Sequence, residues 1–273
     1  MFASAALPEW LVVVLLAIIE GVTEFLPISS TGHLLIVQNT GWLPRQSDLF
    51  NIVIQSGAVL AVLAAFSTKV RHLALTWQEP ATRDYLLKLT AAFVVTGIGG
   101  LLMKKFDLRL AEEAGPVIWA TLLGGIVILA VEGWLRGRPL NENVTWTIAI
   151  AVGLGQLFAA VFPGSSRSGT TILIALALGL TRPAATQFSF LVGIPTLLAA
   201  GALETFLFLR EPPPDQVVHW GMLLLGTVIS AVTAFLVVKW LLRFVQSHTF
   251  IGFGWYRIAL GILLLILTYP GGS

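Results

Sequence analysis

The sequence predicts an all-α integral membrane protein: an inverted repeat of two halves, each with a re-entrant helix-loop-helix hairpin and three transmembrane helices. Three observations support this fold class. The 273-residue chain is 56% hydrophobic and 11% charged, whereas a soluble domain carries about 25% charged residues. Six apolar stretches are long enough to cross a bilayer, and two more are interrupted by polar residues. The two halves of the chain also share one pattern.

The six uninterrupted stretches are read as transmembrane helices. A spanning helix needs about 20 mainly apolar residues, and the stretches that qualify are residues 50–67, 84–103, 116–135, 186–209, 217–242 and 251–269. No large soluble domain remains outside them. We therefore expect residues 1–273 to form a single membrane domain, with repeat 1 at about 1–137 and repeat 2 at about 138–273.

Two further regions, 9–41 and 145–181, are long enough to cross but carry proline and serine/glycine clusters in the middle. We expect each to form a re-entrant pair of half-helices. Non-helical backbone at membrane depth is tolerated only where it is buried in protein or faces a water-filled cavity. The interruptions therefore indicate a site inside the membrane.

The interrupted regions align with each other at an offset of 136 residues. The aligned pairs are Glu20 with Gln156, Pro27 with Pro163, and Ser29–Ser30 with Ser165–Ser166. Each half has three crossings, an odd number, so the halves should be inverted relative to each other. Transporter folds of this kind place their sites near the midplane, at the ends of half-helices.

Basic residues predict the orientation. If both hairpins return to their own side, one face collects nine of them and the other face five. The nine are Lys69, Arg71, Arg83, Lys88, Arg136, Arg138, Arg182, Lys239 and Arg243. By the positive-inside rule we place this face in the cytoplasm, with both termini and the opening of the site outside.

The composition excludes several classes of function. The chain has no cysteine, which rules out disulfides, thiolate catalysis and thiolate metal sites. Its net charge is only +2 and no basic stripe is present, so nucleic acid is not an expected partner. The first apolar run has no basic region before it, and we interpret it as mature sequence rather than a signal peptide.

The second polar loop, FPGSSRSGTTI (162–172), has the composition of a phosphate cradle. Glycines admit close backbone approach, and successive N–H groups and a following helix N-terminus attract anions. Arg167 offers bidentate, permanently charged recognition of phosphate. The predicted phosphate-binding residues here are Gly164, Ser165, Ser166, Ser168, Gly169, Thr170 and Thr171. The alternative is a structural loop whose arginine pairs with a carboxylate.

The first polar loop adds a pair of carboxylates. Glu20 and Glu24 are four residues apart, so they share one face of a helix. Two close carboxylates can share a divalent cation through oxygen ligands. The alternative is a structural pair held by Arg167.

The same loop carries hydroxyls and an imidazole. Ser29, Ser30 and Thr31 are candidate nucleophiles, and Ser29, Thr31 and Gly32 are candidate phosphate ligands. His33 lies one helical turn beyond Ser30, where it can act as general base. The alternative for His33 is a hydrogen-bonding role at a helix N-terminus.

Other intramembrane polar residues carry a weaker signal. Gln55 and Gln156 can line the cavity between the loops, or they can form hydrogen bonds between helices. Glu132 and Arg257 are expected to pair near the inner face.

Several motifs resemble those of one family. EGVTEFLPISSTGH (20–33) and PGSSRSG (163–169) resemble the two signature motifs of the undecaprenyl-diphosphate phosphatase family, known as UppP or BacA. Supporting matches are NIVIQSGAVLAVL (51–63), GLGQ (153–156), FSFLVGIP (188–195) and YRIALG (256–261). Two positions depart from the family pattern, because Asn51 and Gln187 stand where many members carry a carboxylate.

The resemblance implies a hydrolase that converts undecaprenyl diphosphate, a C55 isoprenoid lipid, to undecaprenyl phosphate and inorganic phosphate. This reaction recycles the lipid carrier for peptidoglycan and cell-wall synthesis, and overproduction is associated with bacitracin resistance. The resemblance also implies the bacterial inner membrane, an outward-facing site, a divalent cation (Mg²⁺ or Ca²⁺) and a homodimer. The family's acidic pair falls on Glu20 and Glu24 and its serine-histidine motif on residues 29–33. Its arginine motif falls on Arg167, Ser168, Gly169 and Thr171.

For the reaction we expect Ser30 to attack the terminal phosphorus, with His33 and Glu24 as base and later acid. Arg167 and the backbone of 165–171 would stabilise the equatorial oxygens, and Glu20 would help to hold the cation. Attack by water or by His33 itself stays open.

Three other interpretations stay open as well. A polyprenyl-phosphate transporter or flippase would use the same inverted-repeat phosphate site but needs no nucleophile beside a base. An acid phosphatase of another type needs a later His-x3-Asp pair, which His219 and His248 do not form. A structural or assembly protein would leave both polar loops unexplained.

Overall fold

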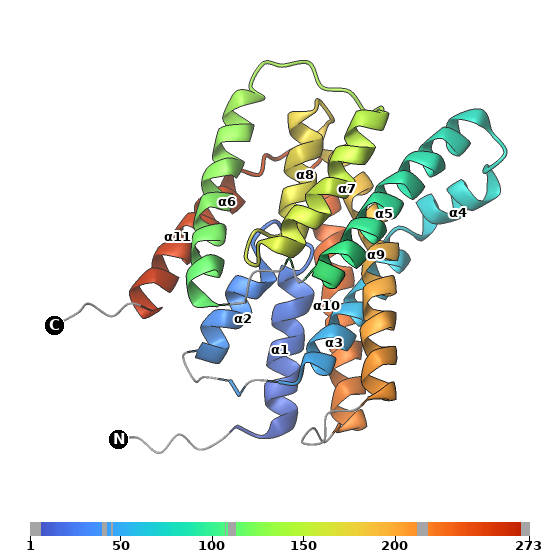
Figure 1. Cartoon of the computed structure of the whole chain (residues 1–273). Coiled ribbons are helices and arrows are strands. Elements are labelled where there is room, and N and C mark those ends of the chain that lie inside the picture. The colour runs from blue at the N-terminus through green and yellow to red at the C-terminus, as the bar shows by residue number, and fades with distance from the viewer. Residues whose placement is uncertain are drawn as a thin grey trace.

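The computed structural model of the chain describes residues 7–39, 43–44, 46–106, 108, 113–211 and 218–268. These residues form eleven α-helices and no β-sheet (Figure 1). The helices are α1 (Glu9–Thr23), α2 (Ser30–Asn39), α3 (Asp48–Ala65), α4 (Ser67–Leu75), α5 (Pro80–Phe106), α6 (Ala114–Trp134), α7 (Trp146–Val161), α8 (Arg167–Ala177), α9 (Arg182–Arg210), α10 (Trp220–Phe244) and α11 (Ile251–Thr268). The predicted all-α class is confirmed.

Five of the described helices are long and apolar enough to cross a membrane: α5, α6, α9, α10 and α11. By length and composition, α3 and α4 together form a sixth candidate, and they are bent by 66° at Phe66. The sequence predicts one straight span over 50–67, whereas the chain turns there and continues as α4. The protein is therefore a multi-pass membrane protein.

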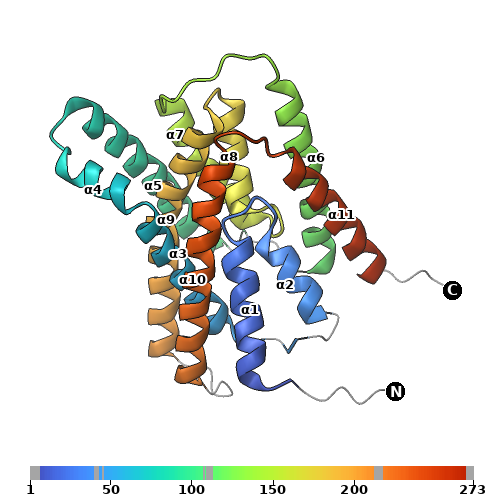
Figure 2. The same cartoon turned by 180° about the vertical axis from the view of Figure 1, so that it is seen from behind.

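The two interrupted regions form hairpins that enter from opposite ends of the molecule. Figures 1 and 2 show α1 rising to the middle of the molecule and α2 returning to the same end, while α7 and α8 do the same from the other end. The start of α1 and the end of α11 lie toward one side. These are the two predicted re-entrant hairpins.

Helix packing follows the repeat. Helix α1 packs on α10, and its counterpart α7 packs on α5. Both contacts are close because small residues lie at the crossing, as is usual between membrane helices. A β-carbon on Gly21 would lie 2.7 Å from the carbonyl oxygen of Ser230, and one on Gly153 would lie 2.8 Å from that of Ala92. These contacts fix both hairpins against long spanning helices.

Between the aligned proline and the returning helix, the second hairpin has one residue more than the first: residues 164–166 follow Pro163, whereas residues 28–29 follow Pro27. Ser29 (φ 71°) and Ser166 (φ 67°) are the non-glycine residues with positive φ in the described chain, and each directly precedes the returning helix. Their numbers differ by 137 (166 minus 29). Gly164, with a φ of 91°, accommodates the extra residue. The alignment at 136 pairs Ser30 with Ser166, but the geometry pairs Ser30 with Arg167.

Candidate active site

The two hairpin loops meet in the middle of the molecule (Figures 1 and 2). The hydroxyl of Ser168 lies 3.0 Å from the carbonyl oxygen of Leu26 and 3.3 Å from that of Glu24. The hydroxyl of Ser166 lies 3.5 Å from the same Leu26 oxygen. The structure thus brings together the two polar clusters, although about half the chain separates them.

Each returning helix begins at this meeting point with a serine cap. The hydroxyl of Ser29 accepts the N–H of Gly32 at 3.2 Å, and the hydroxyl of Ser166 accepts the N–H of Gly169 at 3.2 Å. Serine satisfies a free N–H at such a position, and a positive φ on a non-glycine residue is a strained state found most often at functional sites. Two helix N-termini, each with a partial positive charge, start here and favour an anion.

The carboxylate of Glu24 joins the two hairpins. One oxygen accepts the hydroxyl of Ser30 at 2.9 Å, and the other accepts Nη2 of Arg167 at 2.6 Å. The Arg167 guanidinium also lies against Gly193 of α9, where a β-carbon would come within 2.8 Å of Nη1. Consecutive hydrogen bonds therefore join the Ser30 hydroxyl, the Glu24 carboxylate and the Arg167 guanidinium.

Glu20 lies one turn before Glu24 on α1 and is buried, with its carboxyl group beside the side chains of Glu24 and Gln55. Among the described residues no three His, Cys, Asp or Glu side chains are close enough to form a metal cage. Mg²⁺ is often held by one or two carboxylates together with substrate phosphates and water. Glu20 and Glu24 fit that donor set, and Gln55 lies next to it as the sequence suggests.

The imidazole of His33 is oriented by two contacts. Its Nδ1 lies 2.7 Å from the carbonyl oxygen of Ser29, which can only accept, so Nδ1 carries the proton. Its Nε2 then accepts from the hydroxyl of Tyr256 at 2.6 Å, and the two rings stack with an interplanar angle of 8°. In this arrangement the basic group in contact with Ser30 is Glu24, whereas the imidazole of His33 contacts Tyr256. Sequence reasoning missed Tyr256, although the matching segment 256–261 contains it.

Arg257 is a second residue whose position the sequence did not reveal. Its side chain is fully buried and lies within hydrogen-bond distance of backbone carbonyls in both loops: Pro27, Gly164 and Ser165, at 3.4, 3.0 and 2.9 Å. It also donates to two carbonyls of α6. A buried arginine without a carboxylate partner is expensive, and here five carbonyl dipoles solvate it. Arg257 thus fixes the two loops relative to each other.

The predicted pair of Glu132 with Arg257 is wrong. Glu132 instead binds Arg182 at the start of α9 through both carboxylate oxygens and accepts the backbone N–H of Phe250 at 2.7 Å. Glu132 ends the buried stripe of α6 near the α8–α9 turn, whereas Arg257 reaches the middle of α6 beside Gly124. The two charged residues therefore lie at different parts of α6, with Glu132 near its C-terminal end and Arg257 against its middle.

The other predicted residues lie around this centre. Thr171 bonds back to the carbonyl of Arg167 at 2.9 Å, and the buried hydroxyl oxygen of Ser165 has no hydrogen-bond partner. Thr31 and Thr170 are partly buried in the first turns of α2 and α8. These residues, together with Gly32 and Gly169, lie around the loops. None of them forms a described hydrogen bond to the Glu24 carboxylate.

Gln156 lies behind Arg167. Its amide nitrogen donates to Thr96 at 3.2 Å and to Thr196 at 3.4 Å, which is the interhelical role foreseen for it. It also lines a small cavity together with Arg167 and Ser168, and its Oε1 has no partner. Both interpretations of Gln156 therefore apply.

Known proteins match this chain over nearly its full length. The sequence model of the "Bacitracin resistance protein BacA" family matches residues 13–263. An undecaprenyl-diphosphatase of Rhizobium etli is 47% identical over 258 residues, covering 94% of this chain and 96% of the relative. One of Xylella fastidiosa is 48% identical over 260 residues, covering 94% and 98%. One of Xanthomonas oryzae pv. oryzae is 48% identical over 253 residues, covering 92% and 94%. With a family match from the first hairpin to α11, the chain belongs to the BacA family.

Proposed function

We propose that this chain is an undecaprenyl-diphosphatase, which hydrolyses undecaprenyl diphosphate to undecaprenyl phosphate and inorganic phosphate. Relatives that carry this name are 47–48% identical to it. The observation that carries the proposal within the structure is the double contact of Glu24 with Ser30 and Arg167. A transporter would not need a hydroxyl hydrogen-bonded to a carboxylate beside its phosphate site.

In the first step the oxygen of Ser30 attacks the terminal phosphorus of the diphosphate, and its proton passes to Glu24. The bond from phosphorus to the bridging oxygen breaks, so undecaprenyl phosphate leaves and Ser30 carries the phosphoryl group. Glu24 is placed for this role because it already accepts the Ser30 hydroxyl at 2.9 Å. General-base assistance of this kind contributes about 10²–10⁴-fold to a rate.

Charge on the transferring group is stabilised by Arg167 and by the starts of α2 and α8. Phosphoryl transfer depends mainly on positioning and on stabilising the equatorial oxygens. Arg167 is set for this task by Gly193 on one side and by Glu24 on the other. When the diphosphate binds, its oxygens compete with Glu24 for the guanidinium, which releases Glu24 to act as base.

In the second step water attacks the phosphoserine and inorganic phosphate leaves. The lone pair of His33 Nε2 accepts the proton of the water, and Ser30 takes a proton back from Glu24. The Ser29 carbonyl holds the imidazole in the required tautomer, and Tyr256 holds its orientation until then. Tyr256 is therefore a positioning residue in this scheme.

A divalent cation, Mg²⁺ or Ca²⁺, would be held by Glu20 and Glu24 with diphosphate oxygens. It would supply neutralisation of the diphosphate charge, which these two carboxylates would otherwise repel. Gln55 would orient Glu20 from α3 through the contact already present.

For location we infer the bacterial inner membrane, with the nine-residue basic face in the cytoplasm and the first hairpin open to the outer side. Both termini then lie outside. The polyprenyl tail lies in the bilayer against the apolar spans while the diphosphate dips to the hairpin loops. A homodimer is inferred from the family resemblance alone.

The test is phosphate release from undecaprenyl diphosphate by the purified protein in detergent. We expect turnover by the wild type and a loss of about 10²–10³-fold in Arg167→Ala, the cost of removing one stabilising donor. Hydrolysis does not need a sealed membrane, whereas transport does. A wild type that releases no phosphate in detergent but moves the lipid across vesicle membranes would establish the transporter alternative instead.

A further inference from the structure

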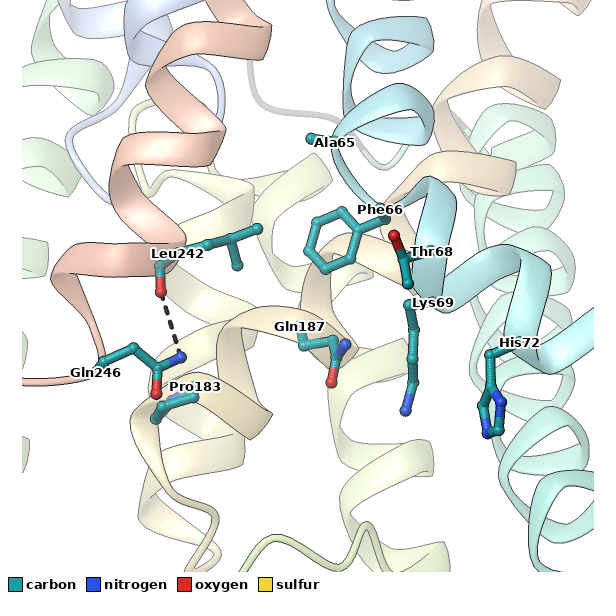
Figure 3. A pocket seen from close by; sticks show the side chains of 9 residues that line it. All are labelled: Ala65, Phe66, Thr68, Lys69, His72, Pro183, Gln187, Leu242 and Gln246. Atoms are coloured by element: carbon teal, nitrogen blue, oxygen red, sulfur yellow. Dashed lines mark hydrogen bonds between the residues drawn. The ribbon is translucent and has the colours of Figure 1, made fainter.

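A second cavity lies away from the hairpin loops. It has a volume of about 460 Å³ and opens between the bend that joins α3 to α4, the start of α9 and the end of α10 (Figure 3). These elements lie toward the end of the molecule from which α7 and α8 enter (Figure 1). The phosphatase scheme assigns this cavity no role.

The polar groups in this cavity are donors and amides. Lys69 and His72 come from α4, Gln187 from α9 and Gln246 from the turn after α10, and the residues that line it include no Asp or Glu. Figure 3 shows Lys69 and Gln187 pointing into the same space. Such a lining attracts an anion with several oxygen acceptors.

In the described part of the chain, no carboxylate neutralises the charge of Lys69. Within the part of the chain that the structure describes, neither Lys69 nor His72 forms a salt bridge to a carboxylate. The Lys69 ammonium instead lies near an aromatic ring, with Nζ 5.3 Å from the ring centroid of Tyr85. A half-buried ammonium without a described carboxylate partner can take an external anion as its counter-ion.

Apart from Thr68, the remaining wall is apolar. Phe66, at the bend, and Leu242, near the end of α10, face the cavity together with Ala65 and Pro183. A free inorganic phosphate would gain nothing from this surface, whereas an amphiphile would cover it. Basic pockets between membrane helices on the cytoplasmic side are known to bind anionic headgroups.

We propose that this cavity binds an anionic phospholipid from the adjacent leaflet, with its phosphate at Lys69 and His72 and its glycerol and first acyl carbons against Phe66 and Leu242. The amides of Gln187 and Gln246 donate to the remaining headgroup oxygens. The site is separate from the diphosphate site and does not depend on the catalytic scheme.

The experiment is native mass spectrometry of the full-length protein, released from detergent micelles that contain equal amounts of phosphatidylglycerol and phosphatidylcholine. The test variant is Lys69→Gln combined with His72→Gln. The matched control is Arg71→Gln, an exposed basic residue of the same helix that does not line the cavity. We expect wild type and control to retain phosphatidylglycerol preferentially, and the test variant to retain about fivefold less.

A second variant, Gln187→Glu, keeps both basic residues and places a carboxylate in the cavity. It should also retain less phosphatidylglycerol. Agreement between the two variants would show that the loss does not come from misfolding of the double variant. Unchanged phosphate release by both cavity variants would show the same. Equal retention by the wild type and both cavity variants would overturn the proposal, as would an equal loss in Arg71→Gln. Displacement of the lipid by millimolar inorganic phosphate would show a free-phosphate site and would also overturn it.

Discussion

The carboxylate of Glu24 and the guanidinium of Arg167 lie 2.6 Å apart, Oε1 to Nη2, although 143 residues separate them in the chain. Both side chains are largely inaccessible, with exposed fractions of 6% and 19%. Each residue belongs to a different re-entrant hairpin, so neither half of the repeat contains a complete site. A diphosphate entering between them would meet an arginine and two helix starts already directed at one point.

Replacing Ser30 with alanine removes the proposed nucleophile but leaves Glu24 paired with Arg167. We expect turnover to fall by about 10³-fold or more, because a nucleophile cannot be bypassed without changing the mechanism. The measurement is phosphate release, together with trapping of a ³²P-labelled protein formed from labelled substrate by a quench in neutral denaturing detergent, which preserves both phosphoserine and phosphohistidine. Labelling that persists in Ser30→Ala and disappears in His33→Ala would transfer the role to His33.

The control for this variant is Ser29→Ala, because Ser29 caps α2 and does not contact Glu24. Loss of a serine cap costs about 1 kcal/mol, and alanine also tolerates a positive φ poorly. Ser29→Ala should therefore lower the melting temperature but retain a labelled phosphoenzyme. Ser30→Ala should leave the melting temperature near the wild-type value and abolish the labelled phosphoenzyme.

Gly193 sets the position of Arg167 from α9. A β-carbon there would lie 2.8 Å from Nη1 of Arg167, so Gly193→Ala should displace the guanidinium from Glu24. We expect phosphate release to fall about tenfold or more, since misplacing a group by about 1 Å can cost 10²-fold. The matched control is Gly97→Ala in α5, where a β-carbon meets nothing within 4 Å. Equal activity in the two variants would show that Arg167 does not depend on α9.

Much of this architecture can be read from the sequence. The six spans and the two interrupted regions follow from hydropathy alone, and the polar loops follow from the cost of polar groups at membrane depth. The bend at Phe66 could not be predicted, because α3 and α4 read as one apolar run that continues into polar residues. The register of the loops was also hidden, since Gly164 shifts the second loop by one residue and only the backbone angles reveal it.

The finer contacts of the site depend on long-range packing. Sequence spacing places His33 one turn from Ser30, but it cannot show that the imidazole turns toward Tyr256, 223 residues away. Arg257 was misassigned for a similar reason. An intramembrane arginine suggests a carboxylate partner, whereas backbone carbonyls of two loops satisfy it here. Every residue carries a backbone carbonyl group, so the sequence does not show which carbonyls accept from an arginine.

Tyr256→Phe removes the hydroxyl that His33 accepts while keeping the stacked ring. We expect kcat to fall about fivefold to tenfold, equivalent to about 1 kcal/mol, because the hydrogen bond that orients the imidazole before water arrives is lost. KM and the melting temperature should stay near wild-type values, because the ring contact is retained. Steady-state kinetics give kcat and KM separately, and thermal unfolding gives the melting temperature. A structural effect of the substitution would lower the melting temperature as well as kcat. The control is Tyr85→Phe, a phenol of α5 outside the site.

Arg257→Met replaces the buried guanidinium by an apolar side chain of similar length. The two loop segments would lose their shared donor, and buried carbonyls would be left without partners. We expect the free energy of unfolding to fall by about 3 kcal/mol or more, measured by thermal unfolding in detergent, with loss of phosphate release. Lys104→Gln breaks a pair whose side chains are 47% and 40% exposed and should cost less than about 1 kcal/mol. Similar losses in both variants would contradict the role given to Arg257.

The dependence on a divalent cation should reside in Glu20. Glu20 and Glu24 are both buried, but in the described hydrogen bonds Glu24 is occupied by Ser30 and Arg167. Glu20 lies beside Gln55 and Glu24, with the charge of Arg167 nearby, and no described hydrogen bond joins it to that guanidinium, so it has more capacity than Glu24 to bind a cation. We expect EDTA to abolish phosphate release and Mg²⁺ or Ca²⁺ to restore it.

In Glu20→Gln the cation concentration for half-maximal rate should rise about tenfold or more, because a carboxylate ligand becomes a neutral amide. Gln55→Leu is the control, since it removes the neighbour of Glu20 but no charge, and it should shift that concentration less. A direct measurement of cation binding by calorimetry in the absence of substrate accompanies the kinetics. Full activity in EDTA, with Glu20→Gln still inactive, would mean that Glu20 acts on the proton or the phosphate rather than on a metal.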